Sequence, residues 1–225
     1  MPSLKSIKPT KICKLCFKEF EDKSLFHLSH DNIKYCRHCL REMKAHFTTF
    51  KVAGYSALSI YRYDDKIQSL LYQLKGCYDI EIADVFLLRY KRELSLYFHS
   101  YVVVPIPSFE HDDKLREFNH VEEIFKSLNL PMKKLFRKTK KVKQADLTAD
   151  KRKLINKYIE LIDDVDLSKT KVLLVDDVYT TGSTIKACIS LIQKLHPKNI
   201  KVLVMSKTES PKEKEESKHL LFDTR

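Results

Sequence analysis

The sequence predicts an α/β fold: a parallel β-sheet with flanking helices, preceded by a small four-cysteine module. Three short runs, 101–104, 172–175 and 200–205, are apolar except for Lys201 and do not alternate with polar residues, which is the composition of strands that are buried on both faces. Stretches with helical periodicity separate these runs, and strands that alternate with helices typically lie parallel in one sheet. The four cysteines form two Cys-x-x-Cys pairs near the N-terminus.

The elements follow one another in a simple order along the chain. Apolar residues at helical spacing after Asp64 predict a helix that includes Leu74, and we expect a second helix from Ile80 to Phe98. The first strand ends at a proline pair, and helical stripes then cover 121–128 and 185–195. The predicted order is β-α-β-α-β. We expect this domain to cover 51–208 and a polar, frayed tail to cover 209–225.

The composition is that of a basic protein with enough apolar residues for its own core. The chain has 225 residues, 43% of them hydrophobic, and 42 Lys+Arg against 30 Asp+Glu give a net charge of +12. With only three glycines it lacks the glycine-rich loops of Rossmann dehydrogenases and Walker-type ATPases. No apolar run approaches the ~18 residues that span a bilayer, and the polar N-terminus does not resemble a signal peptide. We therefore expect a cytoplasmic protein that does not span a membrane.

The cysteine pairs, Cys13-x-x-Cys16 and Cys36-x-x-Cys39, are separated by nineteen residues. Each pair can point two thiolates at one ion, and the intervening loop brings the second pair round to complete a tetrahedron. Cytoplasmic thiols stay reduced, so this spacing favours a structural Zn²⁺ site over two disulfides or four unligated thiols. We expect residues 1–50 to form this module, with no open metal position for catalysis.

The interval 132–157 is strongly basic, with eleven Lys and Arg against two Asp. Such a density of positive charge repels itself unless an anion lies near it. The interval therefore predicts a surface that binds single-stranded DNA through its phosphates, and a solvated loop is the alternative. The residues expected to bind DNA are Lys133, Lys134, Arg137, Lys138, Lys140, Lys141 and Lys143.

The strand 172–175 leads directly into two aspartates and a hydroxyl-rich turn, Asp176-Asp177-Val178-Tyr179-Thr180-Thr181-Gly182-Ser183-Thr184. In a parallel sheet the carboxyl ends of the strands open onto the ligand crevice. The next helix begins with unpaired N–H groups that attract phosphate, and the turn adds four hydroxyl groups and a glycine that permits close approach. The carboxylates can accept hydrogen bonds from ribose hydroxyls or hold Mg²⁺. The pattern predicts a sugar-phosphate site; an ordinary capped helix with two exposed acids is the alternative.

This segment resembles the phosphoribosyl-diphosphate (PRPP) signature of type I phosphoribosyltransferases. In that signature, paired acids meet the ribose hydroxyls and a Thr-Thr-Gly-x-Thr loop holds the 5′-phosphate. The resemblance implies a type I phosphoribosyltransferase-like sheet and Mg²⁺ bound together with PRPP. It also implies that PRPP contacts Asp176, Asp177, Thr180, Thr181, Gly182, Ser183 and Thr184.

Nearly the whole chain resembles the ComF family of competence proteins, which joins a four-cysteine zinc module to a phosphoribosyltransferase-like domain. The segments that resemble family motifs are Leu74-Lys75 with Asp79, Val104-Pro105-Ile106-Pro107, Arg116-Glu117-Phe118-Asn119, and Gln144, Leu147 and Arg152. The sequence departs from the family pattern at Tyr78 and Glu117, which stand in place of glycine, and at His120, which stands in place of glutamine. Glu117 brings a negative charge close to where the diphosphate of PRPP would lie.

The ComF resemblance implies a late-competence protein that handles incoming single-stranded DNA in natural transformation, beside a DNA-uptake helicase or translocase. Lys75, Arg116 and Arg152 are the expected diphosphate contacts, because a leaving diphosphate needs cations. The alternative is an active phosphoribosyltransferase that uses Mg²⁺-PRPP and an unidentified acceptor, with Asp176 and Asp177 as its catalytic residues.

Overall fold

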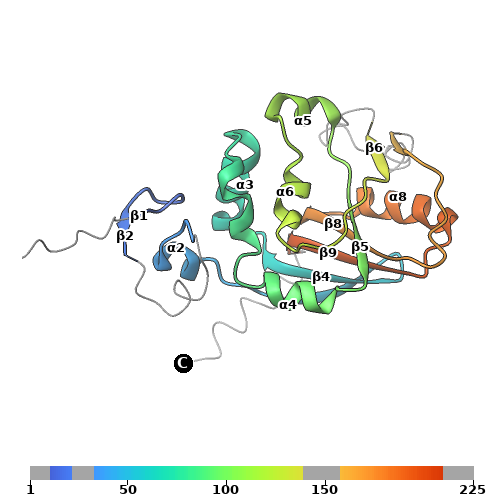
Figure 1. Cartoon of the computed structure of the whole chain (residues 1–225), viewed down its shortest axis with the longest axis horizontal. Helices are drawn as coiled ribbons and strands as arrows, with labels where there is room; N and C mark the ends of the chain where they lie inside the picture. The colour runs from blue at the N-terminus through green and yellow to red at the C-terminus, as the bar shows by residue number, and fades with distance from the viewer. Residues whose placement is uncertain (1–10, 22–32, 139–157, 210–225) are drawn as a thin grey trace, which may run out of the picture. The chain divides into compact units, whose positions relative to one another are not determined.

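The computed structural model describes residues 11–21, 33–138 and 158–209, which divide into two compact units, one up to Lys44 and one from Ala45 on (Figure 1). In the first unit, β1 (Lys11–Ile12) pairs antiparallel with β2 (Glu19–Phe20), and α2 (Arg37–Glu42) follows. The predicted tail, 209–225, lies outside the described residues except for Glu209. The predicted domain bounds stay a prediction.

The second unit is built on a five-stranded sheet of order β3-β4-β9-β8-β5. The three strands predicted from the sequence are confirmed and lie parallel to one another. Each strand is somewhat longer than the run of residues that predicted it. The strands are β5 (Tyr101–Pro105), β8 (Lys171–Tyr179) and β9 (Asn199–Lys207). Val103, Leu173, Val175 and Val204 are among the fully buried residues, which is the burial expected of strands covered on both faces.

A hairpin that the sequence analysis missed extends this sheet. β3 (Thr48–Val52) and β4 (Tyr55–Arg62) pair antiparallel through a turn at Ala53-Gly54, and β4 then pairs parallel with β9. Gly54 has a φ of +87°, the backbone conformation that glycine adopts without steric cost. β3 forms one edge of the sheet.

Three helices form where apolar residues at helical spacing predicted them. Helix α3 (Asp65–Gly76) is capped by Asp64, whose Oδ1 accepts a hydrogen bond from the Ile67 N–H at 2.9 Å. Helix α6 (His120–Lys126) is capped in the same way by Asn119. Helix α8 (Ser183–Ile192), continued by the 3₁₀ turn η4 (Gln193–Leu195), packs against Val172 and Leu174 of β8.

The single helix expected over 80–98 is wrong. The chain instead forms the 3₁₀ segment η1 (Ile80–Phe86) and, after a turn, the short helix α4 (Lys91–Tyr97). Ile82, Ala83 and all four residues from Val85 to Leu88 are buried. Because successive residues of an α-helix are about 100° apart, one straight helix could not place so many neighbouring residues on one face.

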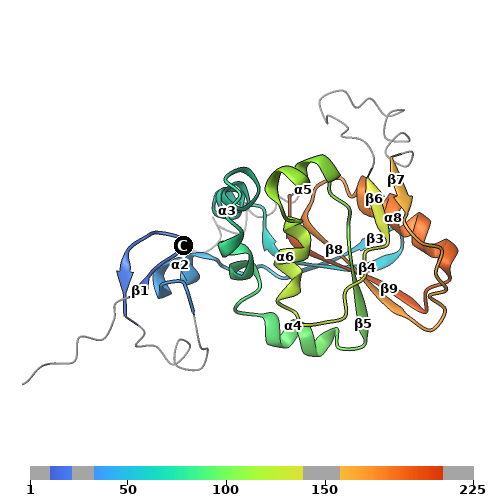
Figure 2. The same ribbon diagram turned by 45° about the horizontal axis from the view of Figure 1, so that its top comes forward.

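Further short elements lie between β5 and β8, where the sequence predicted only the 121–128 stripe. They are α5 (Glu110–Arg116), β6 (Phe136–Lys138) and β7 (Ile159–Leu161), and the last two pair antiparallel. Figure 2 shows β6 and β7 beside α8. Among the helices of the described ranges, none is both long and apolar enough to cross a bilayer.

Candidate functional site

The two acids lie at the carboxyl end of β8, where the strand leaves the core. Asp176 is opposite Val204 of β9 and Val178 is opposite Ser206, so both aspartates are still within the paired part of the strand. Asp177 is buried and Asp176 is half-buried. The Asp177 N–H donates to Asp176 Oδ1 at 3.0 Å, and the Val178 N–H donates to Asp177 Oδ1 at 2.7 Å. These backbone hydrogen bonds fix the orientation of both carboxylates.

Side chains from two other elements meet on the carboxylate of Asp177. Lys75, in the last turn of α3, forms an ion pair with Asp177 Oδ2. His120, the first residue of α6, places its Nε2 at 3.3 Å from the same oxygen. The structure thus brings together the predicted Lys75 and Asp177, and it adds a histidine that the sequence analysis noted only as a departure from a family pattern.

The two neighbouring acids have opposite preferences for a proton. Burial works to raise the pKa of Asp177, but Lys75 and His120 outweigh burial and hold that pKa well below its ordinary value. Burial raises the pKa of Asp176 well above its ordinary value, and the charge of Asp177 adds to the rise. Asp177 is therefore the acid that stays ionised, whereas Asp176 can also donate a hydrogen bond.

One polar atom beside this pair has no partner. His120 Nδ1 is buried and makes no hydrogen bond to any described residue, although the other ring nitrogen contacts Asp177. A buried polar atom without a partner costs free energy, so this nitrogen is a point at which a bound ligand or water would be stabilised.

The turn after β8 has the form of a phosphate cradle. Thr180 and Thr181 are exposed, and the hydroxyl oxygens of Thr181 and Ser183 lie 2.8 Å apart. Gly182 has a φ of +68° and immediately precedes α8, whose first N–H groups have no partner within the helix. A Cβ built on Gly182 would lie 2.6 Å from the hydroxyl oxygen of Tyr179, so only glycine fits without displacing that ring.

Comparisons with known proteins match this part of the chain. Residues 121–223 match the family model described as "Phosphoribosyl transferase domain". The chain carries a phosphoribosyltransferase-type domain. The turn after β8 lies within the matched residues, whereas Lys75 and the cysteine pairs precede them. No match was found among curated proteins.

Several solved structures are similar to this chain. One is a hypoxanthine phosphoribosyltransferase from Staphylococcus aureus, with 12% identity and a TM-score of 0.37 over 56% of this chain and 62% of that chain. Another is a purine phosphoribosyltransferase from Pyrococcus horikoshii, with 18% identity and a TM-score of 0.34 over 57% of this chain and 83% of that chain. A third is a hypoxanthine phosphoribosyltransferase from Trypanosoma cruzi, with 11% identity and a TM-score of 0.36 over 56% and 64%. The chain thus spans about 62% of the length of the first of these enzymes.

Arg116, which precedes the matched residues, lies in a polar network at α5 and the start of α6. Its Nη2 donates to Asp113 Oδ1 at 2.6 Å, and its side chain is only 9% exposed. The Asn119 amide donates to Asp113 Oδ2 and to Ser108 Oγ, both at 2.8 Å. Arg116 therefore pairs within α5, Asn119 joins the start of α6 to the same Asp113, and Arg116 makes no hydrogen bond or ion pair with Asp176 or Asp177. Arg152, another expected diphosphate contact, lies outside the described residues.

The two residues that stand in place of glycine have the backbone conformation that favours glycine. Tyr78 has a φ of +59° and Glu117 a φ of +64°. Glu117 is the C-cap of α5, a position where glycine is common. Both departures from the family pattern therefore lie at turns that have a positive φ even though the residue is not glycine.

The four predicted cysteines form one cluster in the first unit. Their sulfur atoms all lie within 4.8 Å of one another, and the Cys16 and Cys36 sulfurs are 3.8 Å apart. A disulfide bond is about 2.05 Å long, and all four cysteines are free thiols. Burial works to raise the pKa of Cys13, but N–H groups of Cys36, Cys16 and Leu15 outweigh it and lower the pKa to about 7. The cluster could therefore hold a metal ion.

The basic interval is described only in part, since Lys140, Lys141 and Lys143 lie outside the described residues. Lys134 pairs with Glu122 at 2.8 Å, and Arg137 pairs with Glu160 at 2.9 Å. Lys133 is exposed and Lys138 is partly exposed. Half of the described candidates for DNA binding thus already have an acidic partner.

Replacing Gly182 by alanine should destabilise the protein by about 2 kcal/mol, because a Cβ would meet the Tyr179 ring in a left-handed backbone conformation. Chemical denaturation measures the loss. Gly54→Ala is the matched control: Gly54 also has a positive φ, but nothing lies within 4 Å of a Cβ built there. A loss for Gly182→Ala no larger than that for Gly54→Ala would show that the Tyr179 contact does not constrain the turn.

Proposed function

We propose that the turn after β8 binds the ribose 5-phosphate part of PRPP. The observation that carries this proposal is the ionised Asp177, held by Lys75 and His120 directly before a hydroxyl-rich turn at the N-terminus of α8. Each ribose hydroxyl both donates and accepts hydrogen bonds, which suits one ionised acid beside one that can carry a proton. The phosphate is then received by the hydroxyl groups of the turn and the first N–H groups of the helix, which have no partner within the helix.

Mg²⁺ suits this site as an ion that arrives with PRPP. Mg²⁺ is usually held by one or two carboxylates together with substrate phosphates, and it keeps several waters. Asp177 Oδ2 already has two partners, whereas Asp176 is half-buried and has Oδ1 engaged by one N–H. Asp176 is thus the acid with an oxygen open to the ion; the nearby cation would favour its ionised form, and the ion would also neutralise charge on the diphosphate.

Calorimetric titration of Mg²⁺-PRPP tests this site. We expect micromolar binding to the wild-type protein and a loss of at least ~100-fold in Asp176→Asn/Asp177→Asn, because each charged acceptor contributes roughly 1.5–3 kcal/mol. Asp163→Asn/Asp164→Asn is the matched control, an exposed pair of adjacent acids in the same domain. Thermal unfolding of each variant verifies that it is folded. Absence of binding to the wild-type protein, or equal binding by the two double variants, would refute the proposal.

Phosphoribosyl transfer is a second candidate function, favoured by the placement of the Lys75 cation within the site. In such a transfer, the C1–O bond of PRPP breaks with its electron pair leaving on diphosphate. The acceptor supplies the electron pair of the new bond to C1 and releases a proton. Assaying diphosphate release in the same titrations, with single-stranded DNA as the first acceptor, separates transfer from binding alone.

We infer that the cysteine cluster holds one structural Zn²⁺. With Zn–S bonds of about 2.3 Å, the sulfurs of a tetrahedral site lie about 3.8 Å apart. The Cys16 and Cys36 sulfurs are 3.8 Å apart, which is this spacing. Four cysteine ligands would leave no position for substrate.

Elemental analysis of the purified protein should find about one zinc per chain. Cys16→Ser should lower the zinc content and increase amide hydrogen exchange in the first unit, because structural zinc contributes folding free energy. Cys77→Ser is the control, since Cys77 is exposed and lies outside the cluster. A protein that contains no zinc yet protects the amides of α2 fully would contradict the inference.

At the level of the whole chain, we propose a ComF-type competence protein that handles incoming single-stranded DNA. The support is the combination in one chain of a four-cysteine cluster, a phosphoribosyltransferase-type domain and a net charge of +12. A cytoplasmic location and a DNA-uptake helicase or translocase as partner belong to this same proposal. Lys133 and Lys138 are its best described DNA contacts, because neither forms an ion pair with a described acid.

Single-stranded DNA binding should weaken steeply with salt, because lysines that neutralise phosphates release counterions. Replacing both lysines, in Lys133→Ala/Lys138→Ala, should reduce the slope of log K against log salt by ~1.4, at roughly 0.7 per phosphate contact. Fluorescence anisotropy with a labelled oligonucleotide measures both slopes. Lys169→Ala/Lys198→Ala removes the same charge from exposed positions outside the basic interval. A slope near zero for the wild-type protein, or equal changes in both variants, would count against DNA binding through this interval.

A further inference from the structure

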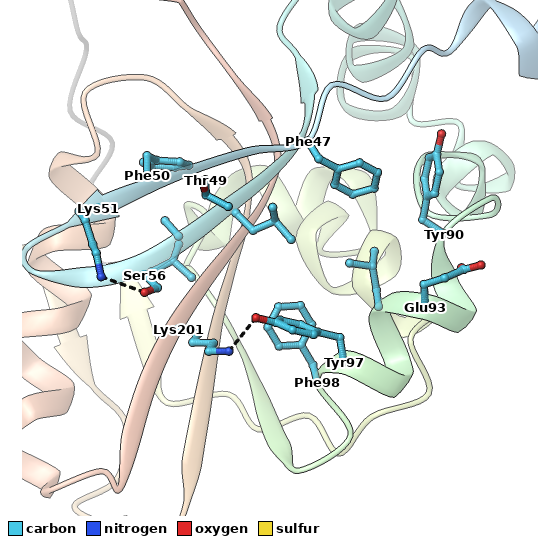
Figure 3. A pocket seen from close by; sticks show the side chains of 14 residues that line it. Phe47, Thr49, Phe50, Lys51, Ser56, Tyr90, Glu93, Tyr97, Phe98 and Lys201 are labelled. Carbon is cyan, nitrogen blue, oxygen red and sulfur yellow. Dashed lines mark hydrogen bonds between the residues drawn. The ribbon is translucent and has the colours of Figure 1, made fainter.

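A cavity of about 780 Å³ lies between α4 and the β3, β4 and β9 part of the sheet (Figure 3). This volume falls within the roughly 300–1,000 Å³ of sites that bind small molecules. None of the residues of the turn after β8 lines it. The cavity is therefore a concave site that the proposed PRPP binding does not use.

Most of the side chains that line the cavity lie on the face of the sheet opposite α8, although Phe50, Ala57 and Val202, which belong to or pack against the α8 core, also line it. Phe50 of β3 packs with the core that includes α8, and successive side chains of a strand point to opposite faces. Thr49 and Lys51 therefore point to the other face, where they line the cavity together with side chains of α4. A ligand bound there would be separated from the helix that receives the phosphate by the sheet itself.

Aromatic side chains form much of the wall. Phe47 and Tyr90 meet edge to face with centroids 5.1 Å apart, and Tyr97 and Phe98 do so at 4.7 Å. Figure 3 shows the two pairs apart from each other. Phe47 is 49% exposed and Tyr97 is 62% exposed, an unusual amount of apolar surface to leave in water around a hollow. Such ring pairs leave faces and edges free to stack on a further flat ring.

The charges that line the cavity favour an anion. Lys201 lies 4.4 Å from the centroid of the Tyr97 ring and donates to the Tyr97 hydroxyl at 3.1 Å, so its ammonium group is held in place (Figure 3). That hydrogen bond raises the pKa of Lys201, which keeps it charged. The Lys51 ammonium donates to Ser56 Oγ at 3.0 Å. Within the described residues neither lysine pairs with a carboxylate, and Glu93 is the one acid that lines the cavity.

We propose that this cavity binds a small, planar aromatic ligand that carries an anionic group. The ring lies between the two aromatic pairs, and the anionic group lies at Lys201, which retains N–H donors beyond the bond to Tyr97. The cation fixes the orientation of the ligand, and the rings supply most of its buried contact area. This site does not depend on the proposed PRPP function.

Titration calorimetry with indole-3-acetate as the probe tests the site, and its neutral amide, indole-3-acetamide, serves as the matched ligand. We expect saturable binding of the carboxylate and about 10-fold weaker binding of the amide. Lys201→Met should weaken carboxylate binding about 10-fold. Lys171→Met is the matched control. Like Lys201, Lys171 lies over a tyrosine ring, that of Tyr101, at 5.7 Å from its centroid, but Lys171 does not line the cavity.

A second pair of variants tests the aromatic wall. Tyr97→Ala should weaken binding of both probes, whereas Tyr72→Ala, at an exposed tyrosine of α3 outside the cavity, should not. Binding should persist in Asp176→Asn/Asp177→Asn, which distinguishes this cavity from the turn after β8. The proposal is overturned if indole-3-acetate does not bind, if the amide binds equally well, or if the two lysine variants behave alike.

Discussion

The carboxylate of Asp177 is the group on which the arrangement of the site depends. A buried charge costs several kcal/mol unless it is paired, and Asp177 pairs with both Lys75 and His120 through one oxygen. Its backbone carbonyl also accepts a hydrogen bond from Ser206 Oγ of β9 at 3.2 Å. One residue at the end of β8 thus fixes the end of α3, the start of α6 and the neighbouring strand. These same contacts hold the pKa of Asp177 low, whereas burial and the charge of Asp177 raise the pKa of Asp176.

The hairpin of β3 and β4 at the edge of the sheet supports the turn after β8. Tyr179, the last residue of β8, packs edge to face on Phe50 of β3, with ring centroids 4.7 Å apart. The same tyrosine ring occupies the space that a Cβ on Gly182 would need. The hairpin, the tyrosine and the glycine therefore form one packed unit that shapes the N-terminus of α8. Phe50 belongs to the sheet on whose opposite face the aromatic cavity lies, so β3 contributes to both sites.

The sequence predicted the parts of this structure that leave a local signal. β8 and β9 each contain a run of four apolar residues, 172–175 and 202–205, and the acids and hydroxyl groups of the turn are adjacent in the chain. The helix expected over 80–98 was wrong because the four consecutive apolar residues 85–88 carry no clear helical period. The pairing of β4 with β9 and the contact of His120 with Asp177 depend on distant residues. Lys75, 102 residues from Asp177, was proposed only because it resembled part of a family motif.

Two strained turns show how the site is positioned without glycine. Tyr78 lies three residues after Lys75 and Glu117 three before His120, and each has a positive φ that costs a non-glycine residue about 1–2 kcal/mol. Such conformations persist only where neighbouring contacts determine them. After α3, the Gln73 amide donates to Asp79 Oδ2 at 2.9 Å; before α6, the Asn119 amide donates to Asp113. These side-chain hydrogen bonds span the turn after Lys75 and the turn before His120, so polar networks outside the site support the elements that carry both residues.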